Sequence, residues 1–434
     1  MQLDTIVAVA TAPTAGAVGI VRLSGPQSWA ILEALSGLRP AVREARLAHL
    51  RDASGQTIDQ ALVLGFKAPA SYTGEDAVEL HGHGNPLLLE KLCRRCVELG
   101  ARRARPGEFS QRAFENGKLD LAQAEAVADL ITAASEDAAQ AAQASLQGVF
   151  SQRCEALAED TLMLRSEVEA WLDFPEEDLG QMQLHSWAKR LQGLQKQLQT
   201  LLLEAEQGVR LNQGMEVLIV GAPNAGKSTL LNALARREVA IVSDIQGTTR
   251  DLVSEQVVLN GVPLRLTDSA GLRDSDDPIE QLGIARMQQA AQKVDRILAL
   301  DAADAPLPAL PEEWTPRLLR VRNKADVDGS SSGWQEDVLH VSAKTGAGLD
   351  LLAASLSGRQ PHQTAFSARQ RHLDALRAAA SHLEASARPL SQSQTLDLAA
   401  EELRLAQSAM GEVTGSVSSE DLLGRIFSSF CIGK

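Results

Sequence analysis

Residues 216–228 read EVLIVGAPNAGKS, in which a short apolar run leads into a glycine-bearing loop and then a lysine and a serine. The spacing from Gly221 to Ser228 matches a phosphate-binding loop, which follows a strand and opens a helix. In such a loop the glycines let backbone amides turn toward a β-phosphate, Lys227 reaches the β- and γ-oxygens, and the Ser228 hydroxyl binds magnesium. The stretch therefore predicts a parallel-sheet nucleotide domain.

Two more motifs follow in the order that such a domain requires. Asp268-Ser269-Ala270-Gly271 comes directly after a predicted strand, so its carboxylate can hold magnesium through water and the Gly271 amide can sense a γ-phosphate. An acid at the end of Asn323-Lys324-Ala325-Asp326 can accept both the N1–H and the N2–H₂ of guanine, a donor pair that adenine lacks. Ser342-Ala343-Lys344 would support the base. The set predicts binding of GTP rather than ATP.

The residues that would hydrolyse GTP differ from those of small GTPases. A glutamine after the magnesium-binding turn orients the attacking water in small GTPases, and here that position is Leu272. Neither Arg250 nor Arg273 can be assigned as an arginine finger. Asn224 lies inside the phosphate loop, where its side-chain carbonyl could hold a monovalent cation together with backbone carbonyls of the loop 243–251. Such a cation would neutralise charge that develops on the phosphates.

The segments on either side of the nucleotide domain differ from it and from each other. Residues 1–118 alternate short β-rich runs with a leucine-bearing helix, which indicates a second α/β domain. Residues 119–147 contain no Gly or Pro and predict one long helix, and helical sequence continues over 151–206 and returns after Pro361. The simplest organisation is one helical domain split in two by the nucleotide domain. The predicted boundaries are 1–118, 119–212 for the first helical half, 213–360 for the nucleotide domain and 361–434 for the second helical half.

The composition of the 434 residues excludes several classes of protein. A formal charge of −14 argues against a general nucleic-acid coat, and an aromatic content of 3% disfavours a stacking platform for single-stranded nucleic acid. No apolar run approaches the roughly 20 residues that span a bilayer. Four scattered cysteines are too few for a disulfide framework. We expect a soluble, cytoplasmic, multidomain protein without a membrane span.

Two short patterns could suggest metal sites. Cys93 and Cys96 form a CxxC pair, but no second pair exists and arginines lie between them, so neither a zinc site nor a redox site is expected. In His81-Gly82-His83-Gly84 the glycines predict a turn rather than a continued strand, so we expect no metal shared by the two histidines.

Eight stretches together carry a resemblance to one family. Those of the nucleotide domain are NAGKST at 224–229, DIQGTTRD at 244–251, DSAGLR at 268–273 and NKAD at 323–326. Those outside it are GIVRLSG at 19–25, SYTGED at 71–76, RPGEFS at 105–110 and FCIGK at 430–434. With these motifs the chain resembles the MnmE family, also called TrmE, of tRNA modification GTPases over essentially its whole length. Many GTPases share the GTP motifs, so FCIGK and the N-terminal blocks are the specific part.

The resemblance implies roles for individual residues of the nucleotide site. In the family a potassium ion sits where Asn224, Ser243, Ile245 and Thr248 fall, and magnesium where Ser228 and Thr249 fall. A glutamate of the second switch orients the attacking water, and Glu280 matches it; without the family, Glu280 reads as a solvated acid at a helix start. The chain departs from the family at Ser269, where Thr is usual, and at Ala285, where relatives often carry an acid. The predicted GTP site comprises Asn224, Ala225, Gly226, Lys227, Ser228, Thr229, Ser243, Asp244, Ile245, Gln246, Gly247, Thr248, Thr249, Asp268, Ser269, Ala270, Gly271, Asn323, Lys324, Ala325, Asp326, Ser342, Ala343 and Lys344.

The resemblance also implies a one-carbon site in the N-terminal domain, which resembles the folate-binding fold of glycine-cleavage aminomethyltransferases. The positions that match family residues in contact with 5-formyl-tetrahydrofolate are Arg22, Glu79, Lys118 and Lys434. A carboxylate such as Glu79 can accept the N–H donors of a pterin, and the cations suit an anionic ligand. In the family Cys431 lies near the folate and is required for the modification. The sequence alone is also compatible with a buried tail cysteine and with surface ion pairs.

For the whole chain, the resemblance implies a potassium-activated GTPase that forms a heterotetramer with the flavoprotein MnmG, which carries FAD. The two would add an aminomethyl or carboxymethylaminomethyl group to carbon 5 of the wobble uridine, position 34, of tRNA, with 5,10-methylene-tetrahydrofolate as one-carbon donor. The chain would form a homodimer through its N-terminal domain. Residues 91–118, with eight Lys or Arg against three Glu, could face tRNA phosphates or solvent. The GTP motifs leave open a regulatory RNA-binding or ribosome-assembly GTPase, which would need neither Glu79 nor Cys431.

Overall fold

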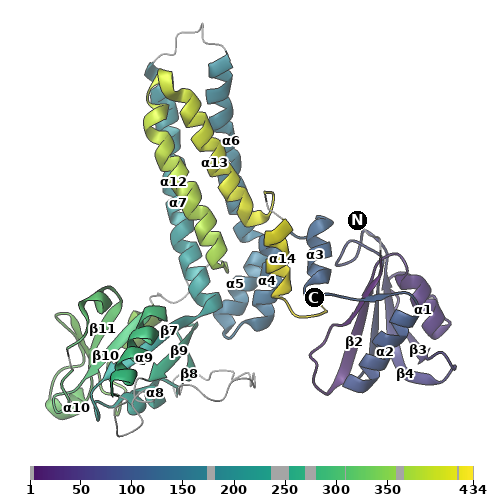
Figure 1. Ribbon diagram of the computed structural model, residues 1–434, viewed down its shortest axis with the longest axis horizontal. Helices are drawn as coiled ribbons and strands as arrows, with labels where there is room; N and C mark the ends of the chain where they lie inside the picture. The colour runs from purple at the N-terminus through teal and green to yellow at the C-terminus, as the bar shows by residue number, and fades with distance from the viewer. Residues whose placement is uncertain are drawn as a thin grey trace. The chain divides into compact units, whose positions relative to one another are not determined.

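The computed structural model describes residues 4–173, 181–235, 254–268, 280–307, 309–357, 366–417 and 420–433. It contains two compact units, Met1–Ala128 with Ser408–Lys434 and Asp129–Gln407, so the two ends of the chain belong to the same unit. Figure 1 labels the helices and strands. Among the described residues, no helix is both long and apolar enough to cross a membrane.

The first unit is built on a six-stranded sheet with the order β3-β4-β5-β2-β1-β6. Two helices, α1 and α2, cover one face of this sheet (Figure 1), where Trp29 and Leu89 pack against Val21 and Leu80. Because side chains alternate along each strand, the other face is left with partly exposed residues. The elements are β1 (Ile6–Val9), β2 (Gly16–Ser24), α1 (Ser28–Ser36), β3 (Arg46–Arg51), β4 (Thr57–Phe66), β5 (Ala77–Gly84), α2 (Pro86–Glu98) and β6 (Arg102–Arg103).

The end of the chain completes this unit through an apolar cluster around Phe427. Its ring centroid lies 6.3 Å from that of Phe114 and 5.5 Å from that of Phe430. Leu121 is fully buried in the same cluster. Burial of these side chains therefore holds the C-terminal segment against the helices that follow the sheet. The helices concerned are α3 (Glu108–Glu115), α4 (Leu121–Thr132) and α14 (Glu420–Ser428).

The second unit contains a helical bundle drawn from both sides of the nucleotide domain, which agrees with the predicted insertion. The segment after that domain returns to the first half of the bundle. Phe366 stacks on Phe150 with ring centroids 4.6 Å apart, and Arg369 donates to the Asp129 carboxylate at 2.6 Å. The bundle elements are α5 (Glu136–Leu146), α6 (Val149–Asp173), α7 (Gln181–Gln213), α12 (Gln370–Leu390), the short η3 (Ser393–Thr395) and α13 (Leu396–Thr414).

The prediction of one helix over 119–147 is wrong, because the chain breaks between α4 and α5. Ser135 adopts an extended backbone, and its hydroxyl accepts the Ala138 amide at 3.1 Å. A serine in this position satisfies an amide that a new helix end would otherwise leave unpaired. Glu136 and Asp137 then lie in the first turn of α5, where negative charge is favourable. The local cap therefore starts a second helix without any Gly or Pro.

The nucleotide domain is a seven-stranded sheet in the order β12-β13-β11-β10-β7-β9-β8. Strands β7, β9, β10, β11 and β13 are parallel, and only the outer strands β8 and β12 run the other way. The predicted parallel-sheet domain is thus confirmed. The elements are β7 (Met215–Gly221), α8 (Lys227–Ala235), β8 (Ser254–Leu259), β9 (Val262–Asp268), α9 (Glu280–Lys293), β10 (Arg296–Asp301), η2 (Glu312–Arg317), β11 (Leu318–Arg322), α10 (Ala325–Asp328), β12 (Gly333–Gln335), β13 (Val338–His340) and α11 (Leu349–Ser357).

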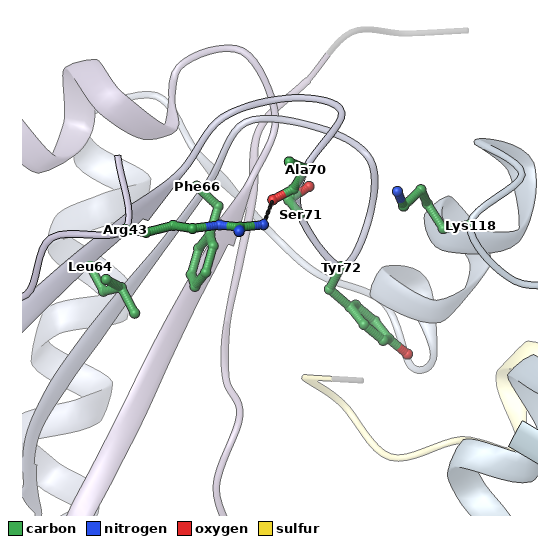
Figure 2. A pocket seen from close by; sticks show the side chains of 7 residues that line it. All are labelled: Arg43, Leu64, Phe66, Ala70, Ser71, Tyr72 and Lys118. Carbon is green, nitrogen blue, oxygen red and sulfur yellow. Dashed lines mark hydrogen bonds between the residues drawn. The ribbon is translucent and has the colours of Figure 1, made fainter. Parts of the chain in front are cut away.

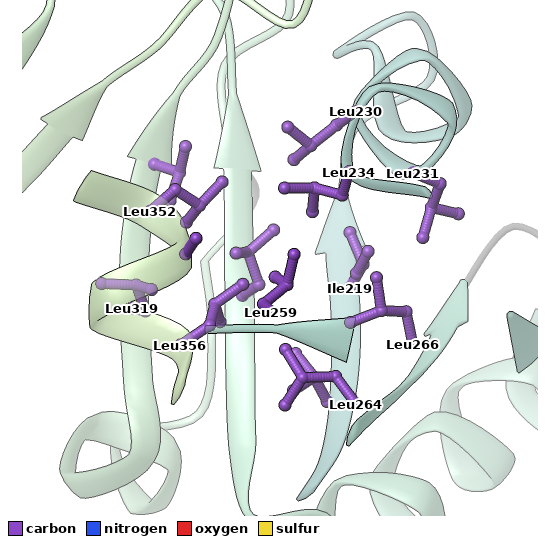
Figure 3. Packing of buried hydrophobic residues seen from close by; sticks show 14 of the residues in the cluster. Ile219, Leu230, Leu231, Leu234, Leu259, Leu264, Leu266, Leu319, Leu352 and Leu356 are labelled. Carbon is purple, nitrogen blue, oxygen red and sulfur yellow. The ribbon is translucent and has the colours of Figure 1, made fainter. Parts of the chain in front are cut away.

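Both faces of this sheet are buried. On one face Ile219 packs with Leu230 of α8 and Leu352 of α11 (Figure 3). On the other face Leu218 packs with Trp314 of η2. A strand buried on both faces reads as a continuous apolar run, which is why residues 216–220 could be recognised in the sequence. In such folds ligands bind outside the carboxyl ends of the strands.

Candidate functional site

The predicted phosphate loop joins the carboxyl end of β7 to the start of α8, as its spacing requires. Asn224 and Gly226 both adopt positive φ, at 64° and 90°. The Lys227 ammonium donates to the carbonyl oxygens of Gly221 and Ala222, each at 3.1 Å. The lysine is therefore held at the mouth of the loop, and Ser228 and Thr229 follow it in the first turn of α8.

Asn323 connects the phosphate loop to the other loops at this edge of the sheet. Its side-chain amide donates to the Ala225 carbonyl at 3.0 Å, and its side-chain oxygen accepts the Ala343 amide at 3.0 Å. The side chain is almost fully buried. A Cβ on Gly226 would collide with the Asn323 amide, so the glycine allows this close approach as well as the positive φ.

The acid predicted to read the base is oriented by a neighbouring loop. Ser342 donates its hydroxyl to Asp326 Oδ1 at 2.5 Å, and Asp326 itself is exposed. Lys324 is in the left-handed region with φ 67° and forms an ion pair with Asp304 at 2.7 Å. The hydrogen bond from Lys324 lowers the pKa of the Asp304 carboxyl. No sequence motif indicates Asp304, because it lies outside the recognised motifs.

Part of the predicted nucleotide site lies outside the described residues: Ser243, Asp244, Ile245, Gln246, Gly247, Thr248, Thr249, Ser269, Ala270 and Gly271. The same is true of the side chains of Asp268 and Glu280, although the backbone of Asp268 ends β9 and that of Glu280 begins α9. Asp268 is the register partner of Ile219 in β7. Its backbone therefore reaches the edge that carries the phosphate loop.

On the sheet of the first unit, Arg22 and Glu79 are direct cross-strand partners. Both Nε and Nη2 of Arg22 lie 2.9 Å from Glu79 Oε1. The second carboxylate oxygen of Glu79 lies 2.9 Å from His81 Nε2. The two charged side chains are only 25% and 17% exposed. Because water screens a half-buried pair less than a surface pair, this is a well-fixed charged group rather than a loose ion pair.

A pocket of about 570 Å³ lies beside this pair. Leu64, which lines it, is the register partner of Glu79 on the next strand. Tyr72 lines it too, and the Arg22 guanidinium lies 5.7 Å from the centre of the Tyr72 ring. Burial raises the pKa of the Tyr72 hydroxyl, which hydrogen bonds Ser110 at 2.9 Å. Figure 2 shows Lys118 across from Tyr72 and the other lining residues, Arg43, Phe66, Ala70 and Ser71.

An ionic network centred on the buried Arg112 and Glu108 holds the segments around this pocket together. Arg112 donates to Asp4 at 2.6 Å and to Glu75 at 3.0 Å, and Glu108 binds Arg102 at 2.6 Å. Burial alone would raise the pKa of Glu108, but hydrogen bonds from the Arg102 side chain and the Arg105 amide outweigh it and lower that pKa to about 2. This network could not be predicted from the spacing of residues in the sequence. Apart from Asp4, its members lie in or beside the SYTGED and RPGEFS blocks, whose resemblance was the only signal.

The tail that carries Cys431 packs against the first unit's sheet and loops. The Gly107 amide donates to the Cys431 carbonyl at 3.3 Å. A Cβ on Gly433 would collide with the Val9 carbonyl, next to the position where β1 pairs with Arg22 of β2. The Cys431 side chain is exposed, so a buried tail cysteine is excluded. Lys434 lies outside the described residues.

The turn predicted at His81-Gly82-His83-Gly84 is wrong, because β5 runs through Gly84. Gly82 instead allows the Asp59 carboxylate to lie close to the β5 backbone, because a Cβ on Gly82 would collide with it. His81 binds Glu79 and His83 binds Asp59 at 2.7 Å. Across the part of the chain that the structure describes, no three acidic, histidine or cysteine side chains form a group that could hold a metal.

The paired cysteines of α2 are buried. Burial raises the pKa of Cys93 to about 11 and that of Cys96 to about 12. Thiols with such values stay protonated at neutral pH and are poor nucleophiles and poor metal ligands.

Comparison with known proteins gives matches along the chain. A family model described as "MnmE helical domain" matches residues 121–431, and one described as "GTP-binding protein TrmE N-terminus" matches residues 5–118. Three relatives are each named "tRNA modification GTPase MnmE". That of Stutzerimonas stutzeri (strain A1501) is 50% identical over 450 residues, 99% of each chain. That of Methylococcus capsulatus (strain Bath) is 49% identical over 445 residues, again 99% of each. That of Neisseria meningitidis (strain FAM18) is 49% identical over 448 residues, 100% of this chain and 99% of the relative.

Proposed function

The chain belongs to the MnmE family of tRNA modification GTPases, and we propose that it couples potassium-activated GTP hydrolysis to modification of carbon 5 of the wobble uridine, position 34, of tRNA. The observation that carries the proposal is the set of hydrogen bonds that connects the predicted nucleotide loops at the carboxyl edge of the nucleotide sheet. Asn323 bonds both the phosphate loop and the loop at Ala343, and Ser342 fixes one oxygen of Asp326. A carboxylate fixed in this way suits the two donors of guanine and has no equivalent partner in adenine.

In this proposal two cations accompany GTP. Magnesium is held by Ser228 and Thr249. Potassium would be held by Asn224 with Ser243, Ile245 and Thr248, and would supply positive charge beside the phosphates where negative charge develops. Asn224 has a φ of 64°, which asparagine adopts at lower cost than most residues, so the backbone of the loop accommodates this residue. Glu280 orients the attacking water.

We further propose that the pocket beside Glu79 binds a tetrahydrofolate derivative, 5,10-methylene- or 5-formyl-tetrahydrofolate. The side chains around it fit such a ligand. Glu79 offers a half-buried carboxylate for the pterin donors, and Lys118 offers a cation at the pocket wall. Tyr72 adds an aromatic surface. Arg22 and Lys434 complete the cationic set, and Cys431 takes part in the one-carbon chemistry.

The proposed assembly is a homodimer that forms a heterotetramer with the FAD-bearing flavoprotein MnmG and acts on tRNA. The open face of the first unit's sheet supports dimerisation. Val18, Leu47 and Leu62 are 60%, 59% and 49% exposed there. The strand registers bring Leu47 opposite Leu62, and both β2 and β4 flank β5. Grouped apolar side chains of this kind mark association surfaces.

Cys431→Ser tests whether tRNA modification depends on the first unit and GTP hydrolysis does not. With MnmG, methylene-tetrahydrofolate, glycine and tRNA, the variant should lose modification by at least about 100-fold, while GTP turnover stays within about twofold, because the exposed thiol belongs to the first unit. Mass spectrometry of tRNA nucleosides and phosphate release measure the two activities.

Thiol labelling provides the control for that experiment. In the folded wild type, a maleimide should react with Cys431 and spare the three buried cysteines, and labelling should stop modification as the substitution does. A Cys431→Ser variant that modifies tRNA at the wild-type rate would remove this residue from the proposed chemistry.

A further inference from the structure

A second pocket lies on the opposite edge of the nucleotide sheet from the phosphate loop. It has a volume of about 330 Å³. Arg296 begins β10 and Met215 begins β7, so the pocket opens at the amino ends of these parallel strands. Helix α7 contributes Arg210, and Gln370 comes from the first position of α12. The pocket therefore sits where both halves of the helical bundle meet the nucleotide domain.

Three arginines from three different elements line this pocket. Arg210 comes from α7, Arg296 from β10 and Arg317 from the end of η2. Asp295 is the acid in the lining, and its Oδ2 already accepts the Glu216 amide at 2.8 Å. Guanidinium groups always carry their charge, so the lining has an excess of positive charge within a chain whose formal charge is −14.

The partners of the three guanidinium groups differ. Arg317 donates to the Val294 carbonyl at 2.9 Å and is thereby fixed at the end of α9. Neither Arg210 nor Arg296 makes a side-chain hydrogen bond or ion pair with any residue in the described ranges. Arg210 and Arg296 are half-buried and line one pocket with Arg317. Like charges gathered in one pocket repel one another, and an anion bound among them would offset this repulsion.

We propose that this pocket binds a phosphate dianion, which bridges Arg210 of the bundle to Arg296 and Arg317 of the nucleotide domain. The forked donors of a guanidinium group match the oxygens of a phosphate group. Such charge-assisted hydrogen bonds are stronger than hydrogen bonds between neutral groups. The volume holds one phosphate with several waters, each of which occupies about 30 Å³ in the liquid. A bound anion would fasten the bundle to the amino edge of the sheet.

The same anion would act on the helix that leads to the nucleotide site. Arg317 binds the carbonyl of Val294, directly after α9, and α9 begins at Glu280. The phosphate group can come from free inorganic phosphate or from an RNA backbone. The recess between α7, α12 and the strand starts favours the small ion, and the two sources are separated by the experiment below.

The test is calorimetric titration of the full chain with inorganic phosphate at constant ionic strength. GDP and magnesium are present throughout, so that the phosphate loop is already occupied. We expect saturable binding to the wild type and an affinity at least about tenfold lower for Arg210→Ala/Arg296→Ala. Arg210→Lys/Arg296→Lys keeps the charge but loses the forked geometry. Its affinity for phosphate should lie between that of the wild type and that of the alanine pair. Lys196→Ala/Arg388→Ala removes two exposed charges of the bundle and should bind like the wild type.

A parallel titration with a short RNA stem-loop distinguishes the sources. If the wild type binds no free phosphate but the RNA affinity falls at least about tenfold in the alanine pair and not in the control pair, the site takes a backbone phosphate. Equal phosphate binding by the wild type and the alanine pair would overturn the proposal. Absence of phosphate binding together with unchanged RNA binding would overturn it as well.

Discussion

The nucleotide edge and the N-terminal pocket assemble their polar groups in different ways. At the nucleotide edge each function belongs to a short continuous motif, and one buried side chain, Asn323, joins two of these motifs through backbone atoms. At the N-terminal pocket Arg22, Glu79 and Lys118 come from two strands and a later loop, and they meet only because the sheet pairs them or the fold turns back. A site built from loops at strand ends can be recognised from the spacing of its motifs. The residues of a site built across strands, here Arg22, Glu79 and Lys118, were indicated only by the resemblance to a family.

The physical reason is the geometry of the two sheets. Parallel strands deliver all their carboxyl ends to one edge, so motifs that follow strands must converge there. In the antiparallel sheet, cross-strand neighbours depend on register, and a shift by one residue would move a side chain to the opposite face. Glu79 faces Arg22 and not the helices only because β2 and β5 pair as they do.

The largest effect is expected at Asp326, and it tests whether this residue reads the base at the nucleotide edge. Asp326→Asn should weaken GTP binding by about 10³-fold, because an amide cannot accept both guanine donors and leaves one unpaired. Binding of xanthosine triphosphate should improve, since xanthine offers a carbonyl where guanine has an amino group. Competition titrations with the two nucleotides measure the change. Asp337→Asn, an exposed hairpin residue, is the matched control, and unchanged GTP selectivity in Asp326→Asn would remove the base-reading role.

An effect of intermediate size is expected in the network behind the N-terminal pocket. The pKa of Glu108 is lowered from 4.5 to about 2 in the folded protein, so its stabilisation is complete above about pH 4.5 and is lost as the pH falls toward 2. A shift of this size corresponds to roughly 3 kcal/mol. Glu108→Gln should therefore lower the melting temperature of the first unit at pH 7.

The melting temperatures of the wild type and Glu108→Gln should also be compared near pH 3, where the prediction can be contradicted. At this pH Glu108 is largely protonated in the unfolded chain, where its pKa is 4.5, so its ionisation in the folded protein stabilises the fold less than at pH 7 and the difference in melting temperature between the wild type and Glu108→Gln should shrink. Calorimetric scans at both pH values measure it. A difference that stays constant would mean that the charge of Glu108 does not stabilise the fold.

The smallest effect is expected at Glu79. Glu79→Gln keeps the shape but removes the charge that Arg22 and His81 contact, so 5-formyl-tetrahydrofolate should bind about tenfold more weakly. GTP hydrolysis should not change. Fluorescence titration with the folate measures binding, and Glu33→Gln on the exposed side of α1 is the control. Full folate affinity in Glu79→Gln would exclude this carboxylate from the site.

The sequence predicted the fold class correctly where apolar patterns were continuous, as in residues 216–220 and in the helical halves around the nucleotide domain. It failed where a local polar contact decided the outcome. Ser135 starts a new helix inside alanine-rich sequence, and Gly82 extends a strand because Asp59 needs the space of its missing Cβ. Patterns of hydrophobicity carry no information about such contacts.

The same limit applies to the sites. The loops of the nucleotide site could be placed from the sequence, although the metal and water roles of their side chains stay predictions. The network of Asp4, Glu75, Glu108 and Arg112 could not be found, since its members are up to 108 residues apart. The three arginines of the second pocket were equally hidden, because they come from segments that look like ordinary surface sequence.

The most direct test of the proposed mechanism is steady-state GTP hydrolysis in potassium against sodium at matched ionic strength, with Asn224→Ala alongside. The exposed helix residue Asn232, changed to alanine, is the matched control. We predict that potassium accelerates hydrolysis by at least about tenfold in the wild type and in Asn232→Ala, and that Asn224→Ala loses this acceleration. Equal rates in the two salts for the wild type would contradict the account, because the phosphate loop would then hold no activating cation.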